Sequence, residues 1–93
     1  MITKGTTVSW TSHAGHETTT KVGVAYPIPA NSPVGPVIDE ISSEVGKVRA
    51  KFNLGWRNHD SFLVLVDRGP GKQKAVYWPR VSALKETGEV ECS

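Results

Sequence analysis

The sequence predicts an all-β domain, a small barrel of about five strands that carries a long proline-rich insertion. Three observations in the second half of the chain lead to this prediction. An apolar run from Phe62 to Val66 meets a Gly-Pro-Gly turn at 69–71. A second strand with aromatic residues then stops at Pro79, and one helical turn over 80–84 precedes a last polar segment. Small barrels of this kind act as binding platforms far more often than as enzymes, but the fold alone does not decide function.

The composition indicates one globular domain over residues 1–93, with 38% hydrophobic and 22% charged residues. A net charge of +2 is too small to predict nucleic-acid binding by itself. The single Cys92 excludes a disulfide-stapled fold. The longest apolar run falls far short of the about 20 residues that a membrane-spanning helix needs. The N-terminus lacks the apolar core of a signal peptide, so we expect a cytoplasmic protein with no membrane partner.

The first predicted strand covers residues 5–10. Val8 and Trp10 alternate there with polar residues, which is the period of a half-buried strand. The following segment, 11–15, is polar and contains glycine, and it is predicted to be a turn-rich loop.

The second predicted strand covers residues 17–26. It opens with three consecutive threonines, whose branched side chains fit a pleated surface. Gly23 interrupts the strand and is predicted to mark a bend or bulge. The apolar residues around it are expected to share one face of the sheet: Val22, Val24 and Tyr26.

Residues 27–55 are predicted to form an insertion between strands two and three. Four prolines interrupt 27–36, and because proline has no N–H for a strand ladder, this part is predicted to be a loop. Apolar spacing of three and four residues then favours a short helix over 37–45, whereas strict alternation favours a strand or extended arm over 47–54. The two patterns meet at Gly46, since glycine inside a helix costs about 1 kcal/mol relative to alanine.

The last part of the chain is predicted to be a hairpin and a closing segment. Residues 61–67 are apolar on both faces and therefore form a central strand, which the turn at 67–72 joins to its partner strand at 73–78. One tight turn at 81–84 follows, and 88–91 is expected to close the sheet. The predicted interior is filled by Val8, Val24, Val64, Val66 and Leu84.

Two stretches carry a resemblance to known small proteins. The motif Lys4-Gly5-x-x-Val8-x-Trp10 resembles the first strand of many SH3-like barrels. The segments RNHDSFLV at 57–64 and YWPRVSAL at 77–84 resemble a group of small uncharacterised proteins of bacteria, phages and mobile gene cassettes. The resemblance leaves 27–55 unmatched, and it implies an SH3-like fold and a genetic context without a reaction.

A more distant resemblance is to the plasmid-borne type II dihydrofolate reductases, which are tetrameric SH3-like barrels. Their Val-Gln-Ile-Tyr-Pro strand and Val-Ala-Ala-Leu turn are similar to the segment 75–84. The ligand-reading glutamine of that family falls on Val76 and the isoleucine on Tyr77. The resemblance therefore implies shared architecture, and an oligomeric reductase-like enzyme is the weakest of three alternatives.

The sequence offers no strong catalytic, metal or cofactor motif. His59, Asp60 and Ser61 have the residue types of a hydrolytic triad, but neighbouring side chains in an extended chain point in alternate directions. His13, His16 and His59 lack the ligand spacing of a zinc site and are better explained as solvated loop residues. The Gly-Pro-Gly-Lys run at 69–72 lacks the spacer, hydroxyl residue and helix of a phosphate-binding loop. We expect no enzyme activity, no metal and no cofactor.

The preferred hypothesis is a non-enzymatic binding module whose partner is a protein or a second copy of the chain. Aromatic residues near the loops of small barrels often form a recognition groove, and an arginine there can add a cation–π contact or hold a carboxylate. Tyr77 and Trp78 are sequential, so one faces the core and the other the outside; the alternative is that the outer one packs beneath the insertion. The candidate partner-binding residues are Trp56, Arg57, His59, Tyr77, Trp78 and Arg80.

The main alternative is a nucleic-acid-binding barrel. Basic residues interleaved with aromatic ones suit phosphates and stacked bases. Acidic residues in the preceding helix, Asp39, Glu40 and Glu44, would offset the positive field. The candidate residues are Lys47, Arg49 and Lys51, with Trp56 and Arg57 just beyond.

Overall fold

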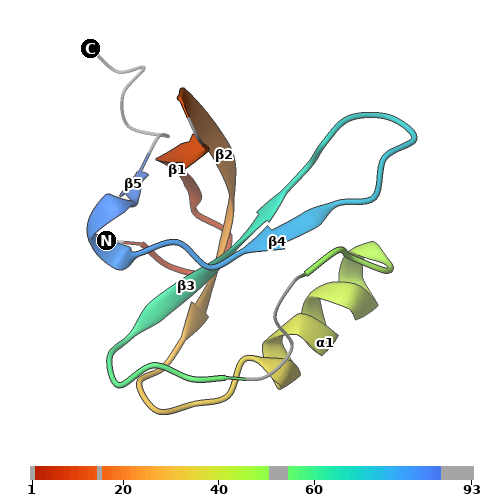
Figure 1. Cartoon of the computed structure of the whole chain (residues 1–93). Helices are drawn as coiled ribbons and strands as arrows, with labels where there is room; N and C mark the ends of the chain where they lie inside the picture. The colour runs from red at the N-terminus through yellow and green to blue at the C-terminus, as the bar shows by residue number, and fades with distance from the viewer. Residues whose placement is uncertain (1, 15, 51–54, 87–93) are drawn as a thin grey trace.

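The computed structural model describes residues 2–14, 16–50 and 55–86, and in this part of the chain it is built mostly of strands (Figure 1). Five strands form one antiparallel sheet in the order β4-β3-β2-β1-β5, with one α-helix against it. The small β-rich fold predicted from the sequence is therefore confirmed. The elements in chain order are β1 (Thr7–Ala14), β2 (Glu17–Ile28), α1 (Gly35–Val45), β3 (Ser61–Val66), β4 (Ala75–Tyr77), a 3₁₀ turn η1 (Val81–Ala83) and β5 (Lys85–Glu86).

The first hairpin is longer than predicted, because β1 continues to Ala14 where a loop was expected from Thr11. Its pairing with β2 runs from Thr7 opposite Val24 to Ala14 opposite Glu17. Considered without their pairing partners, the polar residues of the outer hairpin predict a loop. Their main chain pairs with that of the threonines of β2, and this pairing extends the hairpin to Ala14.

The inner half of β2 lies where the sheet is buried on both faces. Ala25 packs with Val8 and Val64 in one apolar cluster, while Tyr26 packs with Leu63 in the other. Gly23 permits this packing, since a Cβ atom there would lie 2.4 Å from the Leu65 carbonyl oxygen. The glycine predicted to mark a bend therefore marks a close approach between β2 and β3.

Strand β2 also continues through Pro27 to Ile28, so the predicted loop begins two residues later than expected. Pro27 is exposed and lies opposite Phe62, while its neighbours Tyr26 and Ile28 are buried. Burial of these two side chains favours strand geometry on both sides of the proline, although proline gives no N–H to the ladder.

Helix α1 covers one face of the sheet (Figure 1). Pro36 lies in its first turn, where a proline is tolerated because the N–H has no helical partner, so the helix begins earlier than the predicted residue 37. It ends at Gly46 with φ 90°, as the sequence pattern predicts. Ile41 is fully buried, and the partly buried residues that pack beside it are Val37, Ile38 and Val45. With 11 residues it is too short to cross a bilayer, and the described residues contain no other α-helix.

The segment after the helix is extended and lies along β4. Arg49 forms a parallel bridge with Ala75. Val48 and Ala50 pack against the core, while Lys47 and Arg49 are exposed, which confirms the predicted alternation for 47–50. The rest of the predicted arm, 51–54, lies outside the described residues.

The predicted interior is confirmed only in part. Val8 and Val64 are fully buried, whereas Val24, Val66 and Leu84 are partly buried around the two clusters. The first cluster consists of Tyr26, Ile28, Val34, Ile41, Leu63, Leu65 and Val76, and the second of Val8, Trp10, Ala25 and Val64.

The last elements follow the predicted order with shorter bounds. Strand β4 covers three residues rather than 73–78, and η1 supplies the expected single turn. Strand β5 pairs with β1 through Val8 opposite Glu86 and Ser9 opposite Lys85. The pairing of 88–91 that the sequence suggested lies outside the described residues.

Candidate functional site

The central feature of the site is an arginine that lies over a tryptophan ring. The Arg57 guanidinium lies 4.1 Å from the centre of the Trp78 ring. Its Nη2 donates a hydrogen bond to the Trp78 carbonyl at 2.8 Å, and its Nη1 donates one to the Pro79 carbonyl at 3.1 Å. A planar guanidinium fixed by stacking and two carbonyls loses little further freedom when it binds a ligand.

A hydrogen bond and apolar packing hold the Trp78 side chain in place. Its Nε1 donates a hydrogen bond to the Oγ of Ser61 at 2.9 Å, and Ser61 is fully buried in β3. The indole packs against the first apolar cluster, and a Cβ at Gly55 would lie 3.6 Å from its Cζ3 atom. Trp78 is therefore half-buried and packs against the insertion, as the alternative interpretation of the sequence has it.

Tyr77 faces the opposite side of the sheet and does not join this group. Its ring centre lies 5.5 Å from that of Trp10 at an interplanar angle of 58°, and the Lys21 ammonium lies 5.1 Å from it. The two sequential aromatic residues thus point in opposite directions, as strand geometry requires. Neither Tyr77 nor Trp78 is fully exposed, so the expectation that one of them faces outward is only partly met.

A pocket of about 480 Å³ opens beside Arg57. The lining residues are Arg57, His59, Arg80, Val81 and Ser82, so no carboxylate is among the described residues that form its wall. The neighbouring Asp60 turns away, because its Oδ1 accepts a hydrogen bond from the Ala30 N–H at 2.9 Å.

The electrostatics of this pocket favour an anion. Partial burial lowers the pKa of Arg57, and the nearby positive charge of Arg80 lowers it further. Two guanidinium groups that repel each other are both stabilised when a negative group enters between them. Trp56 adds an apolar surface next to Arg57 in the chain, with 62% of the residue exposed.

The residues predicted for the partner surface are thus divided by the structure. Arg57, His59 and Arg80 meet at the pocket, Trp78 supports Arg57 from beneath, and Tyr77 belongs to the other face. Sequence reasoning missed Ser82 and the supporting role of Ser61. The placement of a serine on β3 opposite a tryptophan that directly follows β4 has no local signature in the sequence.

No catalytic arrangement forms around His59. Its Nδ1 lies 3.1 Å from the Asp60 carbonyl oxygen, while the Asp60 carboxylate and the Ser61 hydroxyl bond to Ala30 and Trp78 respectively. Among the described residues no three His, Cys, Asp or Glu side chains form a group that could hold a metal ion. Val76, where the type II reductases carry their glutamine, is buried in the core.

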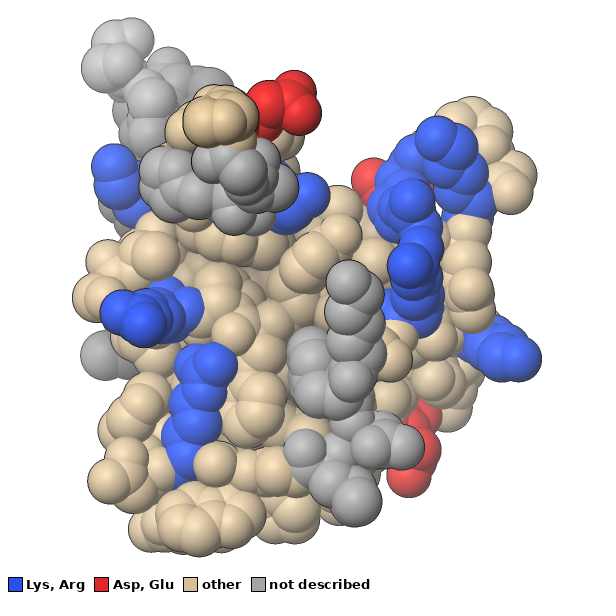
Figure 2. All heavy atoms as spheres, in the orientation of Figure 1, with Lys and Arg blue, Asp and Glu red and all other residues tan. Residues whose placement is uncertain are grey.

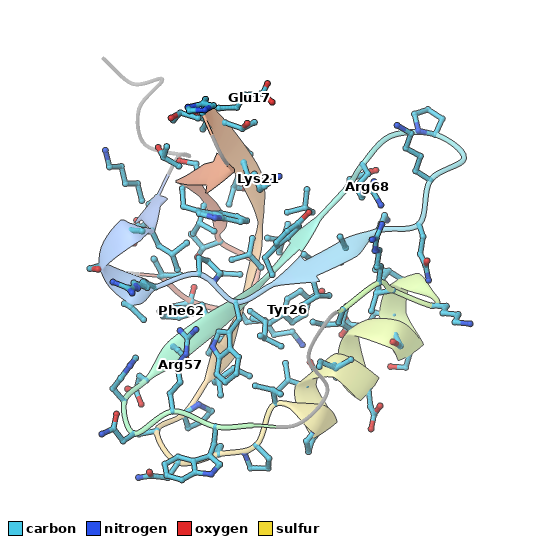
Figure 3. All side chains as sticks on the ribbon, in the orientation of Figure 1. Glu17, Lys21, Tyr26, Arg57, Phe62 and Arg68 are labelled. Carbon is cyan, nitrogen blue, oxygen red and sulfur yellow. The ribbon has the colours of Figure 1, made fainter. Side chains whose placement is uncertain are left out.

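The basic residues proposed for nucleic acid are also divided. Lys47 and Arg49 are exposed beside the start of β4, while Arg57 lies beyond its end. Figure 3 shows Arg57 and the hairpin residue Arg68 at opposite ends of the β3–β4 ribbon. Lys51 lies outside the described residues.

Comparison with protein-family models, with curated proteins and with solved structures finds no match to this chain. The geometry of the site is therefore the basis for its function below.

Proposed function

We propose that this protein is a non-enzymatic binding module with an SH3-like barrel, and that it binds a partner protein at the pocket beside Arg57. The observation that carries the proposal is the Arg57–Trp78 stack, which fixes a guanidinium at the wall of an open pocket that has a second arginine. The contact residues, here called the partner surface, are Trp56, Arg57, His59 and Arg80.

The barrel assignment has support from the order of elements. Strand β5 follows the single 3₁₀ turn and returns to pair with β1, while β2, β3 and β4 pair in sequence. This order agrees with the SH3-like fold that the first-strand motif and the 77–84 segment imply. The bacterial, phage or mobile gene cassette origin is part of the same proposal and depends on that resemblance alone.

The partner is an extended segment that carries a carboxylate. The pocket offers two guanidinium groups and no acidic residue among the described residues of its wall, so a side-chain or terminal carboxylate complements it. The exposed Trp56 offers an apolar face on which a neighbouring side chain of the same segment can pack. A protein partner is favoured over a small ligand because the pocket is open and the residue before Arg57 in the chain, Trp56, is an exposed aromatic.

The test is affinity capture from a bacterial lysate with three immobilised variants beside the parent. We expect at least one protein to be retained by the parent, lost with Trp56→Ala and with Arg80→Gln, and retained with Lys72→Gln, which removes a charge on the distant β3–β4 hairpin. All three residues are exposed, so the substitutions leave the fold intact. Soluble polyglutamate should displace the captured protein.

Two results would overturn the proposal. One is a set of captured proteins that is the same for the parent and every variant. The other is that no protein is captured and that light scattering also gives a strictly monomeric mass. A monomeric mass would exclude a second copy of the chain as the partner. A dimer that Trp56→Ala dissociates would identify the partner as a second copy.

A further inference from the structure

A second positively charged surface lies away from the partner surface, on the hairpin between β3 and β4. The hairpin projects from the sheet beyond α1 (Figure 1), and its connection carries three of the basic residues. Residues 47–50 lie beside it and add two more. We call this set the basic ridge: Lys47, Arg49, Arg68, Lys72 and Lys74.

Hydrogen bonds of the main chain hold the ridge together. The Arg49 N–H donates to the Lys74 carbonyl at 2.8 Å, and the Val76 N–H donates to the Arg49 carbonyl at 2.9 Å. The hairpin tip is closed by the Lys72 N–H, which donates to the Gly69 carbonyl at 3.2 Å. These main-chain hydrogen bonds hold side by side charged residues that are more than 20 residues apart in the sequence.

The ridge has little negative charge of its own. In the described part of the chain, ion pairs join Lys4 to Glu40 and to Glu44, and none involves a ridge residue. Asp67, within the hairpin, accepts a hydrogen bond from the Gly69 N–H at 2.9 Å. Figure 2 shows the Lys and Arg atoms gathered over the hairpin.

The acidic helix offsets this field only in part. Glu44 accepts hydrogen bonds from the Tyr26 hydroxyl at 3.1 Å and from Lys4 at 3.4 Å, and Glu40 pairs with the same lysine. Lys4 therefore compensates one of these two carboxylate charges. With Asp39 the helix keeps two negative charges against the five positive charges of the ridge.

We propose that the basic ridge binds the phosphate backbone of double-stranded DNA without sequence preference. The major groove of B-DNA, about 12 Å wide, is broad enough for the hairpin connection 67–74, which projects past the last strand pair, Val66 opposite Ala75, and phosphates on both sides of the groove are within reach of cations on this connection. The deep, narrow major groove of double-stranded RNA does not admit it. The inference uses residues outside the partner surface and stands independently of the function proposed above.

The experiment measures fluorescence anisotropy of a fluorescein-labelled 24-base-pair DNA duplex against salt concentration. If all five cations contact phosphate, the logarithm of the binding constant should fall with the logarithm of salt with a slope of about −4.5. The variant Arg68→Gln/Lys72→Gln/Lys74→Gln should lose about 2.7 of that slope and bind on the order of tenfold or more weakly at low salt. A control, Lys4→Gln/Lys21→Gln/Lys85→Gln, removes the same charge at residues outside both the ridge and the partner surface and should keep the parent slope.

Circular dichroism of both triple variants establishes that they are folded before binding is measured. The proposal is overturned by the absence of binding at 50 mM salt, or by equal losses in the two triple variants, which would indicate net charge alone. It is also overturned if an RNA duplex of the same sequence binds more tightly than the DNA. Both triple variants keep every residue of the partner surface, so failure here does not count against the function proposed above.

Discussion

The guanidinium of Arg57 stacks 4.1 Å from the ring centre of Trp78 and donates a hydrogen bond to the carbonyl of that same residue. One arginine thus binds both the side chain and the main chain of a residue on the facing segment. The contact joins the loop before β3 to the chain after β4, and it places a cation at the wall of the candidate pocket.

Arg57→Ala should lower the free energy of unfolding by about 1–2 kcal/mol, because it removes a stacked cation and two hydrogen bonds at a half-buried position. Arg57→Lys should recover only part of this, since an ammonium cannot make the same planar contacts. Urea unfolding followed by circular dichroism measures both. Arg80→Ala, at an exposed position, is the control and should stay within about 0.5 kcal/mol. Equal effects of Arg57→Ala and Arg80→Ala would contradict the anchoring role.

Trp78→Phe should leave the buried Ser61 hydroxyl without its present donor, which costs about 1–3 kcal/mol in addition to lost packing. Ser61→Ala in the same chain should relieve part of that loss, so a double-mutant cycle should give a coupling of about 1 kcal/mol. The losses of unfolding free energy caused by Trp78→Phe and by Val22→Ala should be additive, because Val22 is 49% exposed. Additivity in both cycles would show that the hydrogen bond contributes nothing.

Gly23→Ala should destabilise the protein by about 3 kcal/mol or prevent folding, because the new Cβ would meet the Leu65 carbonyl at 2.4 Å and Val64 Cγ1 at 2.6 Å. Backbone atoms of a paired strand cannot move aside cheaply. Thermal unfolding and the yield of folded protein measure the effect. Val22→Ala, one residue away and exposed, should change stability by about 0.5 kcal/mol or less. A stable Gly23→Ala variant would mean that β2 and β3 are farther apart than described.

Stability should fall at alkaline pH through Tyr26. Burial raises its pKa above the ordinary 10.0, and the hydrogen bond and charge of Glu44 raise it further. Because the folded value lies above the unfolded one, this contribution is complete below pH 10 and is lost as pH rises through the folded value. Lys4 acts in the same direction, since its pKa is raised from 10.5, chiefly by the hydrogen bond to Glu40.

Absorbance titration at high pH isolates this residue. The chain has two tyrosines, so in a Tyr77→Phe background the tyrosinate signal reports Tyr26 alone. We expect a midpoint above 10.0 that moves down when Glu44→Gln is added, and an unfolding free energy that declines less steeply above pH 10 in Tyr26→Phe. A midpoint at or below the ordinary value would contradict the contact with Glu44.

Local patterns predicted the elements well where the interaction partners lie nearby in sequence. The spacing of Ile38, Ile41 and Val45 predicted a helix, and Gly46 predicted its end. The outer part of β1 was missed because its polar residues become a strand only through their pairing with β2. Periodicity carries no information about such pairing.

The sequence predicted most residues of the candidate site, and the structure corrected how they are arranged. Arg57, His59 and Arg80 share the pocket as expected, but Tyr77 faces Trp10 and Trp78 lies under Arg57. Alternation along a strand says that two neighbours face opposite sides, and it cannot say which side is covered by the insertion. That depends on the docking of α1 and of the segment that follows it.

By itself the sequence determined where the chain changes direction and which residues alternate between inside and outside. The steric limits at glycine and proline set the turns, and the period of burial sets the alternation. Both act within a few residues. Tertiary structure decided which charges and rings meet. Arg49 pairs with Ala75 through a parallel β-bridge, Arg57 lies over Trp78 where the loop before β3 meets the chain after β4, and Glu44 accepts a hydrogen bond from Tyr26. The energy of each such contact exists only once distant segments have packed, so no local pattern contains it.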